Sequence, residues 1–137
     1  MNGGNPISIT TPLSQMWAQW AGSSDIGRMR DHQEDAFTLP TASSPAVYDR
    51  GLLLVVADGV GGGQAGDEAS RLAVAIIDRT FVDQWTPDIG YSLVQAIQQA
   101  NAQIYQRGQE SDFRGMATTV VCTVVRNDQL YVAHVGD

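Results

Sequence analysis

The stretch that most constrains this chain is "LLLVVADGVGGGQAGDEASRLAVAII", residues 52–77. It joins an apolar run, a single aspartate, a loop with five glycines in eight residues and an amphipathic helix pattern. The apolar run 52–57 has the length of a strand, and its lack of polar residues predicts burial on both faces. Asp67 and Glu68 suit the N-terminus of the following helix. The chain must therefore fold around a strand that ends at Asp58 and leads through glycines into a helix.

The remaining patterns predict a segregated α+β fold rather than a regular alternation of strands and helices. A second helix is expected over 90–107, with Gly108 as its stop. Residues 1–14 are polar and interrupted by prolines, so we expect a flexible lead-in before a single domain over 15–137. The expected additional strands lie within residues 16–27, 34–40, 118–126 and 129–135, the last two joined by a hairpin at Asn127-Asp128.

The overall composition excludes several classes of protein. The chain has 137 residues, 15 acidic and 8 basic, and a net charge of −7, which argues against nucleic acid as a partner. Cys122 is the single cysteine, so no disulfide framework is expected, and its place among valines predicts a core residue. No apolar run has transmembrane length and the N-terminus lacks a signal-like pattern, so we expect no membrane partner and a cytoplasmic location.

The glycine loop has one interpretation as a nucleotide cradle. Gly61, Gly63 and Gly66 have the G-x-G-x-x-G spacing of a dinucleotide fingerprint between a strand and a helix. However, Asp58 separates the strand from the first of these glycines, and a second helical pattern follows where a parallel strand should come. No lysine takes the place that a P-loop requires. The cradle is therefore the weaker of two interpretations.

The other interpretation is that the loop presents a carboxylate to a ligand. A buried strand fixes the backbone of Asp58, and the following glycines let the chain turn and leave the Gly59 carbonyl accessible. Carboxylate and carbonyl oxygens are the hard donors that Mg²⁺ and Mn²⁺ prefer. Taken alone, the Asp58-Gly59 pair is better explained as a simple turn.

Two further acidic segments favour the ligand interpretation. Residues 24–35, "SDIGRMRDHQED", place Glu34 and Asp35 shortly after Arg28 and Arg30. Carboxylates bind cations and a guanidinium group binds phosphate oxygens, although such a charged loop can also be a solvated surface. Asp137 again follows an apolar strand. Three acidic segments at strand ends together predict a site for cations and a phosphate.

These segments resemble the metal-dependent protein serine/threonine phosphatases of the PP2C (PPM) family, bacterial branch. The family motifs occur in order: S-D-x-G-x-x-R-x-x-N-[EQ]-D, a buried strand into D-G-[MVH]-G-G, G-[MT]-x-T-T, and a strand into V-G-D-S-R. The matching segments are 24–35, 52–62, 115–119 and 131–137. The chain has Gln33 in place of the common Asn, Ala117 where Gly is frequent, and Val60 where eukaryotic relatives have a histidine. The later aspartates of the family have no counterpart up to Asp137, so the resemblance implies the N-terminal part of the domain.

The resemblance implies a role for each matching residue. Arg30 would bind the substrate phosphate, and Asp58 would bridge two metal ions, so these two residues would be catalytic. Asp137 would serve a third metal site. The implied metal-binding residues are Glu34, Asp35, Asp58, Gly59 and Asp137. With Val60 in place of a histidine, the acid that protonates the leaving group stays unassigned; His32 is a candidate, with a solvated loop residue as the alternative. His134, within an apolar strand, is expected in the core.

The implied fold is a four-layer αββα sandwich of two antiparallel sheets flanked by helices, only partly present in this chain. The implied function is hydrolysis of phosphoserine and phosphothreonine in proteins by a water that Mg²⁺ or Mn²⁺ activates, in opposition to a Ser/Thr kinase. The alternative is a catalytically incomplete regulatory or scaffold module with the same fold. Whether residues 1–137 are active alone is open at this point.

Overall fold

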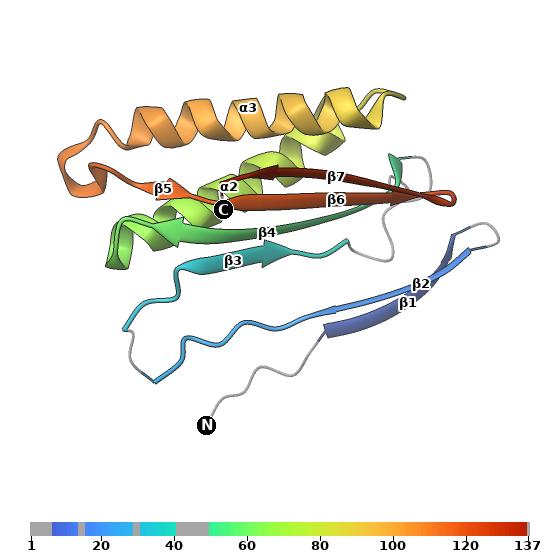
Figure 1. Cartoon of the computed structure of the whole chain (residues 1–137), viewed down its shortest axis with the longest axis horizontal. Coiled ribbons are helices and arrows are strands. Elements are labelled where there is room, and N and C mark those ends of the chain that lie inside the picture. Colours follow the sequence, from blue (N-terminus) through green and yellow to red (C-terminus); the bar gives the residue numbers. More distant parts are fainter. Residues whose placement is uncertain (1–6, 14–15, 29–30, 41–49, 137) are drawn as a thin grey trace.

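The computed structural model describes residues 7–13, 16–28, 31–40 and 50–136. Its order along the chain is two strands, two more strands, two helices, a short 3-10 helix and three strands (Figure 1). The elements are β1 (Ile7–Leu13), β2 (Met16–Gly22), β3 (Asp35–Thr38), β4 (Leu52–Val60), α2 (Gly63–Asp83), α3 (Ile89–Arg107), η1 (Ser111–Phe113), β5 (Ala117–Thr118), β6 (Val120–Arg126) and β7 (Gln129–Val135). Among the described helices, none is long and apolar enough to cross a membrane.

Strands β3 to β7 form one antiparallel sheet with the order β3-β4-β6-β7, and β5 extends the pairing along β4. Helices α2 and α3 cover one face of this sheet, and the β1–β2 hairpin lies on the opposite side (Figure 1). The main core forms between the helices and the sheet, and it includes Val55, Ile77, Phe81, Leu93 and Val124. The expected mixture of an antiparallel sheet with helices is therefore confirmed.

Strand β4 is buried on the helix face, but on the opposite face only at its start, where Leu52 is buried and Leu54 is half-buried. Leu53, Val55 and Ala57 point toward the helices and are buried, whereas Val56 and Val60 are 56% and 54% exposed. The prediction that the whole apolar run is buried on both faces is therefore wrong. The physical reason is that the helices cover one face only. The apolar content of a strand does not indicate which of its faces packs against another element.

The β1–β2 hairpin was not expected in full. Residues 7–13, which the sequence predicted to belong to a flexible lead-in, pair with β2 from Ile7↔Gly22 to Leu13↔Met16. Pro12 is compatible with this strand because a two-stranded hairpin leaves each strand with an unpaired edge. Trp20 of β2 is buried against Leu52 and so covers one end of the open sheet face.

Several local expectations are confirmed. Helix α3 begins after Asp88, whose side chain accepts a hydrogen bond from the Tyr91 amide, and it ends before Gly108. The β6–β7 hairpin turns at Asn127, which has a φ of 55°. Cys122 is fully buried, and this burial raises the pKa of its thiol to about 12.

Helix α2 begins earlier than its acidic residues suggested. It starts at Gly63, so its first turn contains no acidic side chain. Asp67 and Glu68 instead lie in the second turn, and both form ion pairs of 3.1 Å with Arg71. The expected role of these two carboxylates at the helix N-terminus is therefore wrong, and the pairs contribute little stability because Arg71 is exposed to solvent.

Candidate functional site

Two of the candidate carboxylates face each other across the sheet. Asp35 of β3 and Asp58 of β4 are directly paired in the antiparallel register. Residues paired in this way project to the same face with their Cβ atoms about 4.5–5.5 Å apart. That face is the open one, away from the helices, and both residues are exposed. Like charges directly opposite each other are destabilising, so this arrangement favours a cation between them.

Glu34 connects β4 to the start of α2. Its backbone carbonyl accepts a hydrogen bond of 2.9 Å from the Gly59 amide. Its side chain Oε1 accepts a hydrogen bond of 2.6 Å from the Gly63 amide, the first of the helix. A carboxylate at this position satisfies one of the free amides of the helix and interacts favourably with its dipole. Sequence reasoning missed this capping role; its one signal was that the residues directly before α2 are glycines, which have no side chain to cap a helix.

The glycine loop serves close packing and sharp turning. Gly61, Gly62 and Gly63 have φ values of 125°, 72° and 55°, which L side chains rarely adopt. Gly59 is buried, and a Cβ atom at this position would lie 2.1 Å from the carbonyl oxygen of Gly66 in α2. The loop therefore lets the strand and helix approach each other, and the carboxylate of Glu34 already occupies the amide that a cradled phosphate would need. These features argue against a nucleotide cradle.

Two threonines hold the backbone of Asp58. The Thr119 amide donates to the Asp58 carbonyl at 2.9 Å, and the Asp58 amide donates to Thr119 Oγ1 at 3.3 Å. Thr118 Oγ1 lies 3.0 Å from the same carbonyl. From the sequence, these threonines were identified only as part of a motif. The signal available was two adjacent hydroxyl side chains where a strand was expected.

The remaining candidate residues are Arg30, Asp137 and the two histidines. Arg30 and Asp137 lie outside the described residues, although a Cβ atom at Gly136, which precedes Asp137, would lie 3.0 Å from Thr119 Cγ2. His32 is exposed, as a loop residue is expected to be, and lies 3.8 Å from where a Cβ atom at Gly63 would be. His134 is also exposed, so its expected place in the core is wrong. It lies on the open face of β7, where alternation directs every second residue away from the helices.

The acidic loop before β3 is closed by its own polar side chains. The side-chain Nε2 of Gln33 donates to Ser24 Oγ, and the backbone amide of Gly27 donates to the Asp25 carboxylate at 2.7 Å. Gln33 therefore fills a structural role at the position where the family pattern commonly has asparagine. Across residues 7–13, 16–28, 31–40 and 50–136, no three His, Cys, Asp or Glu residues gather closely enough to hold a metal ion together.

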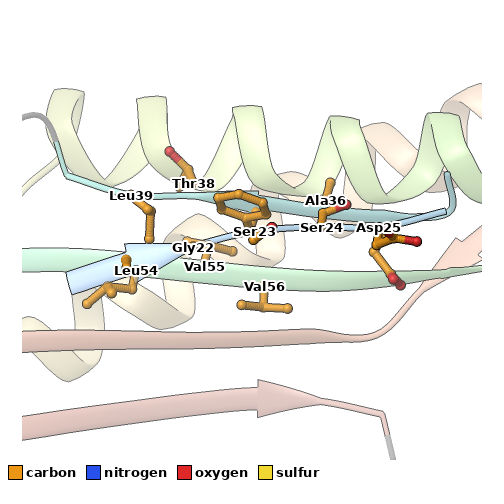
Figure 2. Close-up of a pocket in the computed structure, with 13 residues that line it drawn as sticks. Gly22, Ser23, Ser24, Asp25, Ala36, Thr38, Leu39, Leu54, Val55 and Val56 are labelled. Carbon is orange, nitrogen blue, oxygen red and sulfur yellow. The ribbon is translucent and has the colours of Figure 1, made fainter. Parts of the chain in front are cut away.

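A groove of about 350 Å³ lies on the open face beside the carboxylates. Its walls are the segment 21–25, strand β3 with Leu39, and residues 54–56 of β4. Figure 2 shows Leu39 and Leu54 near one end and Asp25 at the other. The apolar end therefore lies next to the β1–β2 hairpin, and the acidic end leads toward Asp35.

Comparison with known proteins assigns the chain to a family. The family model described as "Protein phosphatase 2C" matches residues 28–137. A putative protein phosphatase 2C-type from Streptococcus pyogenes is 34% identical over 119 residues, which cover 82% of this chain and 45% of the relative. The serine/threonine protein phosphatase PstP from Mycobacterium tuberculosis is 32% identical over 120 residues, which cover 87% of this chain and 21% of the relative.

Solved structures give the same result. The catalytic domain of PstP, in complex with two manganese ions, matches with a TM-score of 0.65 at 32% identity, over 83% of this chain and 46% of that one. The phosphatase Stp1 from Staphylococcus aureus matches with a TM-score of 0.71 at 30% identity, over 83% and 44%. The chain spans less than half the length of the relatives it matches. The family model, the matching fold and the ordered motifs together show that the chain belongs to the protein phosphatase 2C family.

Proposed function

We propose that the protein hydrolyses phosphoserine and phosphothreonine in other proteins with the help of Mg²⁺ or Mn²⁺. The observation that carries this proposal is the direct pairing of Asp35 with Asp58 on an exposed face. Two facing carboxylates repel each other unless a cation lies between them. Relatives from Listeria innocua and Mycobacterium tuberculosis are named serine/threonine phosphatases, which supports the substrate class.

The residues present fit divalent ions as part of a ligand set. Asp35 and Asp58 supply hard oxygen donors on one face, and we assign Glu34, the Gly59 carbonyl and Asp137 as the remaining ligands from this chain. The manganese complex of PstP supports two ions, and we assign Asp137 to a third. Such ions, when bound, acidify water and neutralise charge on the phosphate.

Arg30 is the proposed phosphate ligand. A guanidinium group matches phosphate oxygens in two parallel hydrogen bonds and stabilises charge that builds on them during the reaction. Arg30 precedes Asp35, the first residue of β3, by five positions in the sequence. Asp58, held by the two threonines, would keep the catalytic ligand fixed while the substrate binds.

We also propose that a second antiparallel sheet covers the open face and completes a four-layer sandwich, with residues 15–137 forming the N-terminal portion of the domain. Support comes from the apolar side chains exposed on that face, since large exposed apolar patches mark contact surfaces. They are Val56, Val121, Leu130 and Val132. The greater length of the relatives supplies enough chain for such a sheet.

A Ser/Thr kinase that produces the phosphoprotein is the implied opposing partner, and we place both in the cytoplasm. The alternative function, a catalytically incomplete regulatory or scaffold module, keeps the fold without turnover. The family match and the naming of the relatives as phosphatases favour the enzyme.

The test is hydrolysis of p-nitrophenyl phosphate and of a phosphothreonine peptide by the complete protein, with and without Mn²⁺. We expect Mn²⁺-dependent turnover that falls by at least about 100-fold in Asp58→Asn, the order lost when one electrostatic group of an active site is removed. Without Mn²⁺, thermal unfolding should stay close to that of the wild type, because Asp58 is exposed among the described residues. Unchanged turnover in Asp58→Asn would contradict the assignment, and absence of turnover in the wild type would favour the scaffold.

A further inference from the structure

The candidate ligand Asp58 lies at an irregular point of the sheet. Strand β4 pairs with β6 as far as Val56↔Val121 and with β5 from Gly59↔Thr118. Asp58 therefore faces Thr119 between the two pairings. In a regular antiparallel pair the carbonyl of the facing residue would accept the Asp58 amide hydrogen. Here Thr119 Oγ1 accepts it instead, at 3.3 Å.

The hydroxyl group of Thr118 donates to the carbonyl of Thr119, which does not accept the Asp58 amide hydrogen. Thr118 Oγ1 lies 2.8 Å from the Thr119 carbonyl and 3.0 Å from the Asp58 carbonyl. A hydroxyl has a single proton to donate, so these two acceptors share it. Side-chain hydroxyl groups therefore form the hydrogen bonds that regular strand pairing would form here. The backbone groups are not left unpaired, as is expected of a stable part of the fold.

The methyl group of Thr119 fixes a second backbone segment. A Cβ atom at Gly136 would lie 3.0 Å from Thr119 Cγ2 and 3.3 Å from Thr119 Cβ. Gly136 also has a φ of 85°, so glycine is required there both for its conformation and for its lack of a side chain. Gly136 directly precedes Asp137, another proposed ligand.

We propose that Thr119 is a positioning residue that sets the backbone of two metal-binding segments at once. Its hydroxyl accepts the amide hydrogen of Asp58, and its methyl group packs against the residue before Asp137. Because threonine alone combines a hydroxyl and a methyl on Cβ, neither serine nor valine reproduces both contacts. This inference rests on the proposed metal site and adds the residue that orients it.

The experiment compares Thr119→Val, Thr119→Ser and Thr123→Val in the complete protein. Valine keeps the shape and the strand preference of threonine but removes the hydroxyl acceptor. Thr123 is the matched control, since it lies on the same face in the strand that directly follows Thr119, β6, but pairs with Leu54, away from Asp58. The readouts are the dissociation constant for Mn²⁺ by calorimetry, hydrogen exchange of the Asp58 amide, and the melting temperature.

In Thr119→Val we expect Mn²⁺ binding to weaken about fivefold to tenfold, the equivalent of one hydrogen bond, and the Asp58 amide to exchange faster. Thr119→Ser should keep the amide protected and recover most of the affinity. Thr123→Val should bind Mn²⁺ like the wild type. If Thr119→Val does not fold, Thr119→Ala against Thr119→Ser gives the same comparison.

Wild-type Mn²⁺ affinity and an equally protected Asp58 amide in Thr119→Val would overturn the inference. Asp58→Asn separates this failure from a failure of the proposed function. If Asp58→Asn loses Mn²⁺ binding while Thr119→Val does not, only the positioning role is wrong. If Asp58→Asn also binds Mn²⁺ like the wild type, the metal site itself is wrong and the inference is overturned with it.

Discussion

The two faces of the main sheet differ in what they carry. The face toward α2 and α3 is a closed core of apolar side chains around Val55, Phe81 and Val124. The opposite face combines exposed valines with the facing pair Asp35 and Asp58, and the β1–β2 hairpin is the described segment that covers part of it. One face therefore forms the apolar core, and the other carries the residues of the proposed site. Strand β4 contributes side chains to both faces, because alternate residues of a strand point in opposite directions.

The largest expected difference between the faces is in the cost of removing apolar volume. Phe81 is 2% exposed, so Phe81→Ala should lower the free energy of unfolding by about 3–5 kcal/mol. Val132 is 57% exposed in the described residues, and if a second sheet covers it in the complete protein, Val132→Ala should cost about 1.6 kcal/mol at about 0.8 per methylene. Urea denaturation measures both. A cost for Val132→Ala near zero would contradict the covering sheet.

The next largest effect concerns the contact between β4 and α2. Gly59→Ala should destabilise the protein by about 1–3 kcal/mol, as overpacking does, because its Cβ would collide with the Gly66 carbonyl. Gly66→Ala is the matched comparison, since its Cβ would lie 3.2 Å from the nearest atom of Gly59 and requires a smaller shift. Chemical denaturation should rank Gly59→Ala as the more costly. The reverse order would mean that the strand and helix do not approach in this way.

These differences also explain how much could be predicted from the sequence. Helix α3, strand β3 and the Asn127 hairpin were predicted because caps, prolines and turn residues are local signals. The pairing of Asp35 with Asp58 was not, since strand register depends on the fold as a whole. The capping of α2 by Glu34 links residues 29 positions apart and left no local pattern beyond the glycines. Exposure of Val56 and His134 depends on which face the helices cover.

The smallest expected effect is on the open face without metal. Asp35→Asn removes one of two facing charges, so the metal-free protein should gain about 0.5 kcal/mol in the free energy of unfolding. In excess Mn²⁺ the same substitution should lower stability relative to the wild type, because a ligand of the bound state is lost. Melting curves with a chelator and with Mn²⁺ test this change of sign. The same sign in both conditions would mean that Asp35 does not bind the ion.

The central claim is that Asp35 and Asp58 bind a divalent ion on the open face of the sheet. The most direct test is a crystal of the complete protein soaked in manganese, with the ion located by its anomalous scattering. We predict a peak in contact with both carboxylates and its loss in Asp58→Asn. Manganese bound elsewhere, with both carboxylates in contact with solvent only, would contradict the claim.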